Sequence, residues 1–242
     1  MTTERYEIQV QGVRVEVVRK DVKNFHLGVY PPKGRVRAAV PRRLNDAAVR
    51  VAVASRLGWI RRQRARFEEQ DRQSAREMVS GECHYFRGRR YRLSVVERDG
   101  PSGVSLLNDR TLELQVRPGA GREQREAVLQ RWYRERLREQ IPALIAKWEP
   151  QVGVTVADWG VKRMKTRWGS CNVEARRIWV NLELAKKSDA CLELVLLHEM
   201  VHLLERRHCE RFREHMDRLM PQWRLYRDQL NRAPLAHEEW GL

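Results

Sequence analysis

Apolar and polar residues alternate along much of the first 118 residues, as they do in strands. Apolar side chains occupy every second position over 6–10 and again over 13–17, and Gln11-Gly12 separates the two runs. Since side chains on a strand point alternately to opposite faces, and glycine suits tight turns, these runs predict a hairpin. The same alternation predicts further strands over 25–29, 36–40, 91–95 and 112–116.

Two other segments have helical spacing. Apolar residues recur every three or four positions between residues 49 and 67, which predicts a helix there. After a break at 117–121 (RPGAG), the same spacing predicts a long connecting helix over 119–150. Pro142 lacks a backbone N–H, so we expect it to kink or divide this helix.

The C-terminal part mixes both patterns. Strand-like residues occur around 152–156, 161–168 and 178–180, and helical spacing begins at Cys191. The sequence therefore predicts an α+β fold, with a β-rich N-terminal part that contains a long helix and a C-terminal part with a short sheet and helices. We expect the parts to span 1–118, 119–150 and 151–242.

The composition is that of a globular protein. Hydrophobic residues make up 42% of the 242 and charged residues 33%, which disfavours disorder. We find no secretory signal, and the apolar-rich stretch 192–204 is too short and too polar to span a membrane, so we expect a soluble, cytoplasmic protein. The four cysteines form no CxxC pair, so neither a disulfide framework nor a cysteine zinc site is predicted.

The net charge of +16 is the compositional outlier. Such a field favours anionic partners, among them nucleotides, nucleic acid and acidic surfaces. Solvated arginines on helix faces would give the same excess without any ligand. The charge is thus compatible with an anionic ligand as well as with solvated arginines, and it does not identify nucleic acid as a partner, because the chain has no helix-turn-helix, zinc-finger or RNP pattern.

Candidate chemistry is concentrated in residues 197–203 (LHEMVHL). His198 and His202 are four residues apart, which on a helix places them about 40° apart around the axis and one turn along it. Both imidazoles can then reach one zinc ion. Glu199, beside the first histidine, can act as the general base that takes a proton from a water on the metal.

A catalytic zinc needs a third protein ligand and an open position for water. His208 lies six residues past His202, so a continuous helix would turn it about 240° away from the first two histidines. We favour His208 and therefore expect the helix to break near 205–207. Glu205 is the alternative, since it lies three residues after His202 on nearly the same face, but it could instead orient a ligand histidine. His215 is left outside the site.

Other residues share a family pattern with this motif, namely 167–171 (RWGSC), Ile178, Asn181-Leu182, Trp59-Ile60, Gly81-Glu82 and Tyr91. Together with HExxH at 198–202 and with His208, they resemble the YgjP-like family of metal-dependent hydrolases. That family is related to the WLM and SprT-like zinc peptidases. The resemblance covers most of the chain, and RWGSC with HExxH and a third histidine is more specific than HExxH alone.

The resemblance implies a zincin-like C-terminal part that holds one zinc ion through His198, His202 and His208, although other divalent transition metals also bind imidazoles. It implies metallopeptidase-like activity, while some members are assigned the hydrolysis of UTP to UMP and diphosphate. The family often has proline before the zinc helix, where this chain has 185–187 (AKK). It also has Asn-His-Ser around the third ligand, where this chain has 207–209 (RHC). These departures concern substrate preference, since neither removes a ligand.

Two substrates are therefore considered, a peptide and a nucleotide. A peptidase needs an extended groove, often with a strand edge that pairs with the peptide, and the strand over 177–181 could supply that edge. A UTP pyrophosphohydrolase needs cations for the phosphates, and Arg163, Lys165 and Arg167 are the candidate substrate-binding residues. A SprT-like protease associated with nucleic acid and a non-catalytic zinc scaffold are less favoured. We predict a zinc-dependent, metallopeptidase-like hydrolase, with UTP pyrophosphohydrolysis as the alternative.

Overall fold

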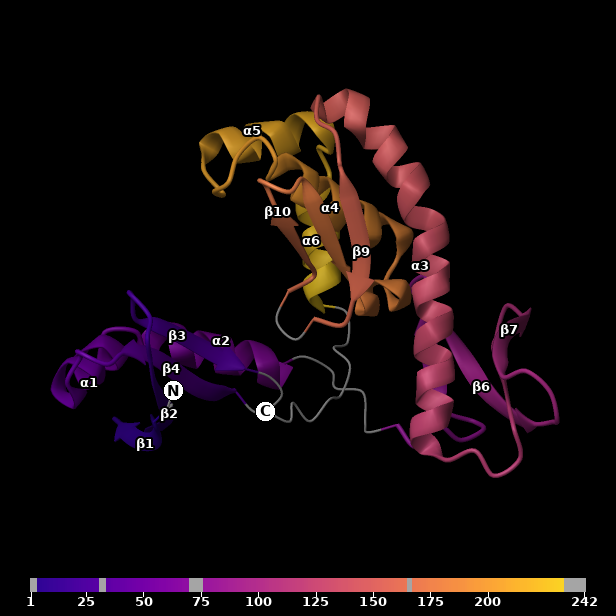
Figure 1. Ribbon diagram of the computed structural model, residues 1–242, viewed down its shortest axis with the longest axis horizontal. Helices are drawn as coiled ribbons and strands as arrows, with labels where there is room; N and C mark the ends of the chain where they lie inside the picture. Colours follow the sequence, from indigo (N-terminus) through magenta and orange to yellow (C-terminus); the bar gives the residue numbers. More distant parts are fainter. Residues whose placement is uncertain (1–3, 31–33, 70–75, 165–166, 233–242) are drawn as a thin grey trace. The chain divides into compact units, whose positions relative to one another are not determined.

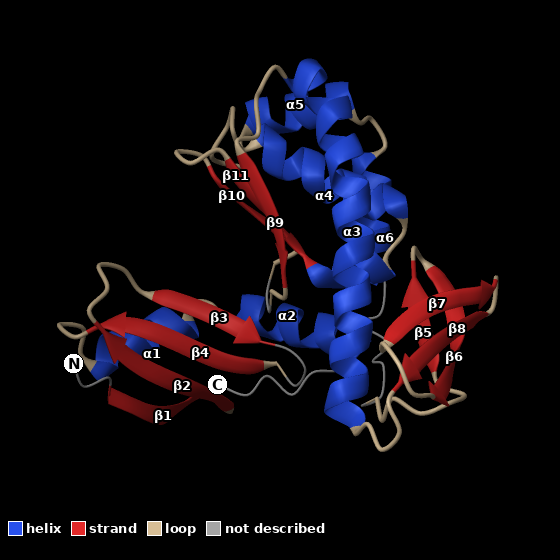
Figure 2. Cartoon of the chain, turned by 45° about the vertical axis from the view of Figure 1, so that its right-hand side comes forward, coloured by secondary structure: helices blue, strands red, loops and turns tan. Residues whose placement is uncertain are grey.

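The computed structural model describes residues 4–30, 34–69, 76–164 and 167–232, and its fold class is α+β, as the sequence predicts (Figures 1 and 2). The described residues form two compact units, one N-terminal to Ser74 and one within Ala75–Ala233. The boundary between them falls inside the segment 1–118. Alternation alone cannot reveal it, because the pattern predicts strands without saying which sheet each one joins.

The first unit contains a four-stranded sheet with the order β1-β2-β4-β3 and two helices. The predicted hairpin is confirmed, with Val10 paired to Val13 and positive φ angles at Gln11 and Gly12 in the turn. The helix expected over 49–67 is two helices, because the chain turns between Ala54 and Leu57. The elements are β1 (Glu4–Val10), β2 (Val13–Lys20), β3 (His26–Tyr30), β4 (Arg35–Pro41), α1 (Asp46–Ala54) and α2 (Leu57–Glu69).

The second unit begins with a sheet of the same topology, with the order β5-β6-β8-β7. In both sheets the two central strands are parallel and each outer strand pairs antiparallel. Alternation missed β5 and β7, because β5 has only four residues and most of β7 is exposed on both faces. The strands are β5 (Cys83–Phe86), β6 (Arg89–Glu97), β7 (Gly103–Asn108) and β8 (Thr111–Val116).

A single helix, α3 (Arg122–Val152), joins this sheet to the C-terminal part (Figure 1). The expectation that Pro142 divides it is wrong, since the helix is continuous through that residue. A proline removes one N–H donor, and the buried neighbours Ile141 and Ile145 anchor the helix on either side. Gly153 ends the helix in the left-handed conformation, with φ of +79°, which glycine adopts without strain.

The C-terminal part has a three-stranded sheet with the order β10-β11-β9. The expectation that 177–181 forms a free edge is wrong, because β11 lies between the other two strands. β10 is an outer strand instead, and its sequence GSCN carries no apolar alternation that would have predicted it. The elements are β9 (Asp158–Lys162), β10 (Gly169–Asn172), β11 (Arg177–Asn181), the 3-10 helix η1 (Leu182–Lys186), α4 (Asp189–Val201), α5 (Glu210–Leu219) and α6 (Trp223–Arg232).

Helix α4 is the centre of the second unit's core. Most of its residues between Cys191 and Val201 are buried, against α3, α5, α6 and the three-stranded sheet (Figure 2). A helix buried on nearly all sides is held rigidly by packing, so the side chains that it carries have fixed positions. Among the described helices, none combines the length and the apolar character that crossing a bilayer requires.

Candidate metal centre and its pocket

Three histidines come together at the end of α4. Their ligand nitrogens all lie within 4.8 Å of one another, and Nε2 of His198 is 2.9 Å from Nε2 of His208. α4 ends at Val201 and α5 begins at Glu210, so the chain turns between them and brings His208 back beside His198 and His202. The helix break that His208 requires is therefore present in the structure.

Glu205 lies outside this group of nitrogens. Its carboxylate pairs with Arg211 at 3.2 Å, while its backbone oxygen lies 3.0 Å from Nδ1 of His202. A carbonyl oxygen can only accept, so Nδ1 of His202 donates this hydrogen bond and carries the ring proton. The Nε2 lone pair of His202 is left available to a metal. Glu205 thus orients a histidine through its backbone, as partners of metal ligands commonly do.

The protonation states favour metal binding. Burial, reinforced by the neighbouring histidines, lowers the pKa of His198 to about 3. Burial and then the charge of His202 also lower the pKa of His208. These imidazoles are therefore neutral near pH 7, which is the state that ligates a metal. Three imidazoles with converging nitrogens fit a divalent transition metal such as zinc.

Phe212 packs against all three imidazoles at once. The centroid of its ring is 4.9 Å from that of His198, 4.8 Å from that of His202 and 4.9 Å from that of His208. Phe212 lies in the first turn of α5 and is 2% exposed. The ring holds the histidines from one side and leaves their nitrogens facing one another. Sequence reasoning missed this residue, because nothing in a lone buried phenylalanine indicates what it touches.

Glu199 lies beside the histidines against the backbone of β10. It is 7% exposed, and burial raises the pKa of its carboxyl to about 7, although nearby Arg167 opposes the rise. A Cβ atom at Gly169 would lie 2.6 Å from Oε1 of Glu199 and 2.7 Å from its Cγ. The glycine of the RWGSC run therefore provides the space that the carboxylate occupies.

A pocket of about 940 Å³ opens onto these residues. Its walls are the segment 167–174, which contains β10, one face of α4, and α6, and His198, Glu199, His202 and His208 are part of its lining. The three histidines, the carboxylate of Glu199 and an outer strand of the sheet thus meet in one cavity. Such an arrangement can hold a metal and a substrate together while excluding much of the solvent.

The chain matches one family of known proteins over residues 24–233, and that family is described as a YgjP-like, metallopeptidase domain. The chain belongs to the YgjP-like family. Comparisons with curated proteins and with solved structures find no match. Membership supports a metal-dependent hydrolase of metallopeptidase-like type. It also implies a divalent metal, and the three histidines offer the ligand atoms for one.

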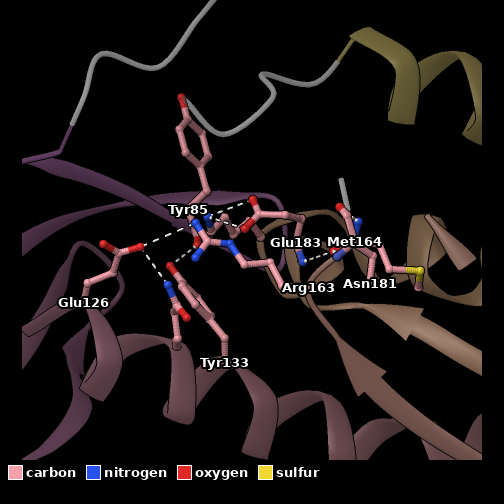
Figure 3. Close-up of polar contacts among 9 residues, drawn as sticks. Tyr85, Glu126, Tyr133, Arg163, Met164, Asn181 and Glu183 are labelled. Carbon is pink, nitrogen blue, oxygen red and sulfur yellow. Dashed lines mark hydrogen bonds and ion pairs between the residues drawn. The ribbon is translucent and has the colours of Figure 1, made fainter. Parts of the chain in front are cut away.

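The candidate substrate-binding residues of this YgjP-like protein do not all lie at the pocket. Arg167 is exposed and lines the pocket. Arg163 is not among the lining residues, and its guanidinium lies 3.6 Å from the carboxylate of Glu126 on α3 (Figure 3). Lys165 lies outside the described residues. Two arginines that sequence reasoning missed, Arg206 and Arg227, also line the pocket, but their positions depend on the turn after α4 and on α6.

Asn181 fixes the segment that leads into β10 (Figure 3). It is 4% exposed, and its Nδ2 donates to the backbone oxygens of Met164 at 2.9 Å and Arg167 at 2.7 Å. Its Oδ1 accepts from the backbone nitrogens of Met164 at 3.3 Å and Glu183 at 3.2 Å. This amide thus uses both its donors and its acceptor on the backbone, and it anchors Met164 and Arg167 ahead of β10 and Glu183 after β11.

Proposed function

We propose that the chain is a zinc-dependent peptidase, with His198, His202 and His208 as the metal ligands and Glu199 as the general base. The observation that carries this proposal is the convergence of three imidazoles beside one buried carboxylate. The imidazoles leave a coordination position open, as catalytic zinc sites do, whereas structural sites are usually closed by cysteines. Family membership supports the same class of chemistry.

Each residue then has a distinct task. A zinc ion held by the three histidines would polarise the scissile carbonyl and make water more acidic. Glu199 would take a proton from the attacking water and pass it to the leaving amine, a role that its raised pKa suits. β10 is an outer strand of the sheet, with order β10-β11-β9, and it lines the pocket, so an extended peptide could add to the sheet there. The edge is close to the carboxylate because Gly169 contacts Glu199.

The test is cleavage of unfolded casein by the zinc-loaded full chain. We expect cleavage with one zinc per chain, and we expect Glu199→Gln to keep the zinc while losing at least about 100-fold in rate. Glu214→Gln is the matched control, because Glu214 is an exposed carboxylate on α5. Zinc content by mass spectrometry separates loss of the base from loss of the metal. Retained turnover in Glu199→Gln would overturn the general-base role.

A second candidate is hydrolysis of UTP to UMP and diphosphate at the same site. The observation in its favour is the set of three arginines on the pocket wall, Arg167, Arg206 and Arg227, which could neutralise phosphates. Arg206 and Arg227 are partly engaged, by Glu174 at 3.7 Å and Asp228 at 3.1 Å. Diphosphate release from UTP without casein cleavage would favour this activity over the peptidase.

A further inference from the structure

The pocket has an apolar end that the proposed chemistry does not use. Its walls there are Leu194 and Val195 of α4 together with Trp223 and Leu230 of α6. Each of these residues is at most 9% exposed, so each is anchored in the core and presents only a small surface to the cavity. The histidines, Glu199, Arg167 and Arg206 line the rest of the same cavity, while Arg227 shares the α6 face with Trp223 and holds its guanidinium 5.1 Å from the centroid of the Trp223 ring. The pocket therefore joins a polar reaction centre to an apolar compartment.

The apolar compartment begins one helical turn from the reaction centre. Leu194 precedes His198 by four residues, and Val195 precedes Glu199 by four. On α4 each pair shares a face and is separated by about 6 Å along the axis. A peptide whose scissile bond lies at the histidines would thus place the side chain next to that bond beside Leu194 and Val195. The distance of about 6 Å is one that a single side chain can span.

Helix α6 forms the opposite wall with a single face. Trp223, Arg227 and Leu230 follow one another at spacings of four and three residues, and all three line the pocket. Nε1 of Trp223 donates to Oδ1 of Asp217 at 2.7 Å, so the one polar atom of the indole already has a partner. Arg224 holds that carboxylate in turn, with Nη2 3.1 Å from Oδ2. The wall is therefore preformed, and a ligand would not have to order it.

We propose that this compartment is a side-chain subsite for a bulky apolar residue of the substrate, next to the bond that is cleaved. The inference rests on the proposed function, because a group held at the metal centre must direct the side chain into it. A leucine or phenylalanine side chain would leave water for apolar walls, and that transfer is favourable in proportion to the area buried. A glycine at the same position would gain nothing from the subsite.

The test uses N-acetyl amino-acid hydroxamates, whose hydroxamate group chelates zinc while the side chain explores the subsite. Calorimetry with the zinc-loaded full chain measures affinity without relying on turnover. We expect the leucine and phenylalanine derivatives to bind about tenfold tighter than the glycine derivative, or more. Equal affinities would overturn the subsite but leave the metal centre intact. Failure of the glycine derivative itself to bind would overturn the metal centre and the subsite with it.

Variants on one helix locate the effect. Leu230→Ala should lower the leucine-to-glycine affinity ratio about fivefold without changing the glycine affinity. Leu225→Ala is the matched control, since Leu225 is on the same helix but 65% exposed, and it should change neither. If Leu230→Ala does not fold, Val195→Ile fills the compartment from α4 and should weaken binding of the phenylalanine derivative alone. An unchanged leucine-to-glycine ratio in folded Leu230→Ala, or unchanged binding of the phenylalanine derivative to Val195→Ile, would overturn the subsite.

Discussion

Gly169 and Glu199 are in direct contact, and the space for the carboxylate exists only because residue 169 has no side chain. An alanine there would place its Cβ 2.6 Å from Oε1 and 2.9 Å from Cδ of Glu199. The backbone is fixed on both sides of this contact, since Gly169 pairs with Val180 in the sheet and Glu199 is carried by the buried helix α4. Either the backbone at residue 169 or the Glu199 side chain must therefore shift. The Glu199 carboxylate is the part that is free to rotate.

We accordingly expect Gly169→Ala to displace Glu199 and to reduce peptide cleavage by about 100-fold, the scale of a lost general base. Zinc content should stay at one per chain, because none of the histidines is moved. Gly103→Ala is the control, since Gly103 is also a strand glycine but has open space around its Cβ position. Wild-type kcat in Gly169→Ala would show that the contact does not position the base.

The third-ligand position can be read from metal content. We expect His208→Ala to lose the bound zinc, whereas Glu205→Ala should retain it, because the Glu205 contact to His202 uses the backbone oxygen that alanine also has. Dialysis against a zinc buffer followed by mass spectrometry gives the stoichiometry of each variant. The reverse pattern, with zinc lost only from Glu205→Ala, would make the carboxylate the ligand.

Phe212 should affect zinc affinity without touching the metal. Replacing it by leucine removes the flat ring that contacts all three imidazoles. We expect Phe212→Leu to weaken zinc binding about tenfold, the lower end of what residues supporting metal ligands contribute. Met216→Leu, one turn further along α5 and equally buried, is the control for core packing. Competition with a chromophoric chelator measures both affinities, and equal values would mean that Phe212 only fills space.

Much of the metal centre was accessible from the sequence because its parts are close in the chain. His198, Glu199 and His202 lie within five residues on one helix, so helix geometry alone predicts that they share a face. His208 needed a break in the helix, which the spacing required but could not demonstrate. The parts of the site that could be predicted are those whose residues lie close together in the sequence.

The residues that sequence reasoning missed owe their role to distant contacts. Gly169 and Glu199 are 30 positions apart, and Arg227 reaches the pocket only because α6 packs on α4. The edge strand is expected at 177–181 because that run lies just before the zinc helix, yet β11 is the central strand of its sheet, since the position of a strand along the chain does not fix its place in the sheet. The order of strands in a sheet depends on tertiary contacts, so the periodicity of apolar residues does not predict it.

His84 should make the fold sensitive to mild acid. Its side chain is 3% exposed, and burial, followed by the charge of Arg76, lowers its pKa from 6.5 to about 4 despite the opposing effect of Glu82. Above pH 6.5 the ring is neutral in both the folded and the unfolded chain, so it adds no pH dependence. As the pH falls below 6.5, the His84 ring binds a proton in the unfolded chain but stays neutral in the folded chain. The free energy of unfolding therefore decreases until about pH 4.

At pH 5 this single group should have removed about 2 kcal/mol of stability relative to pH 7.5. His84→Gln has no ring to titrate, so its free energy of unfolding should fall by correspondingly less over the same interval. Urea unfolding of both proteins at pH 7.5, 6.5 and 5 measures the difference, with the metal removed so that zinc release does not contribute. The two proteins differ at this one position, so contributions from the rest of the chain cancel in the comparison. Parallel pH dependences for the two proteins would mean that His84 takes up its proton in the folded state as readily as in the unfolded chain.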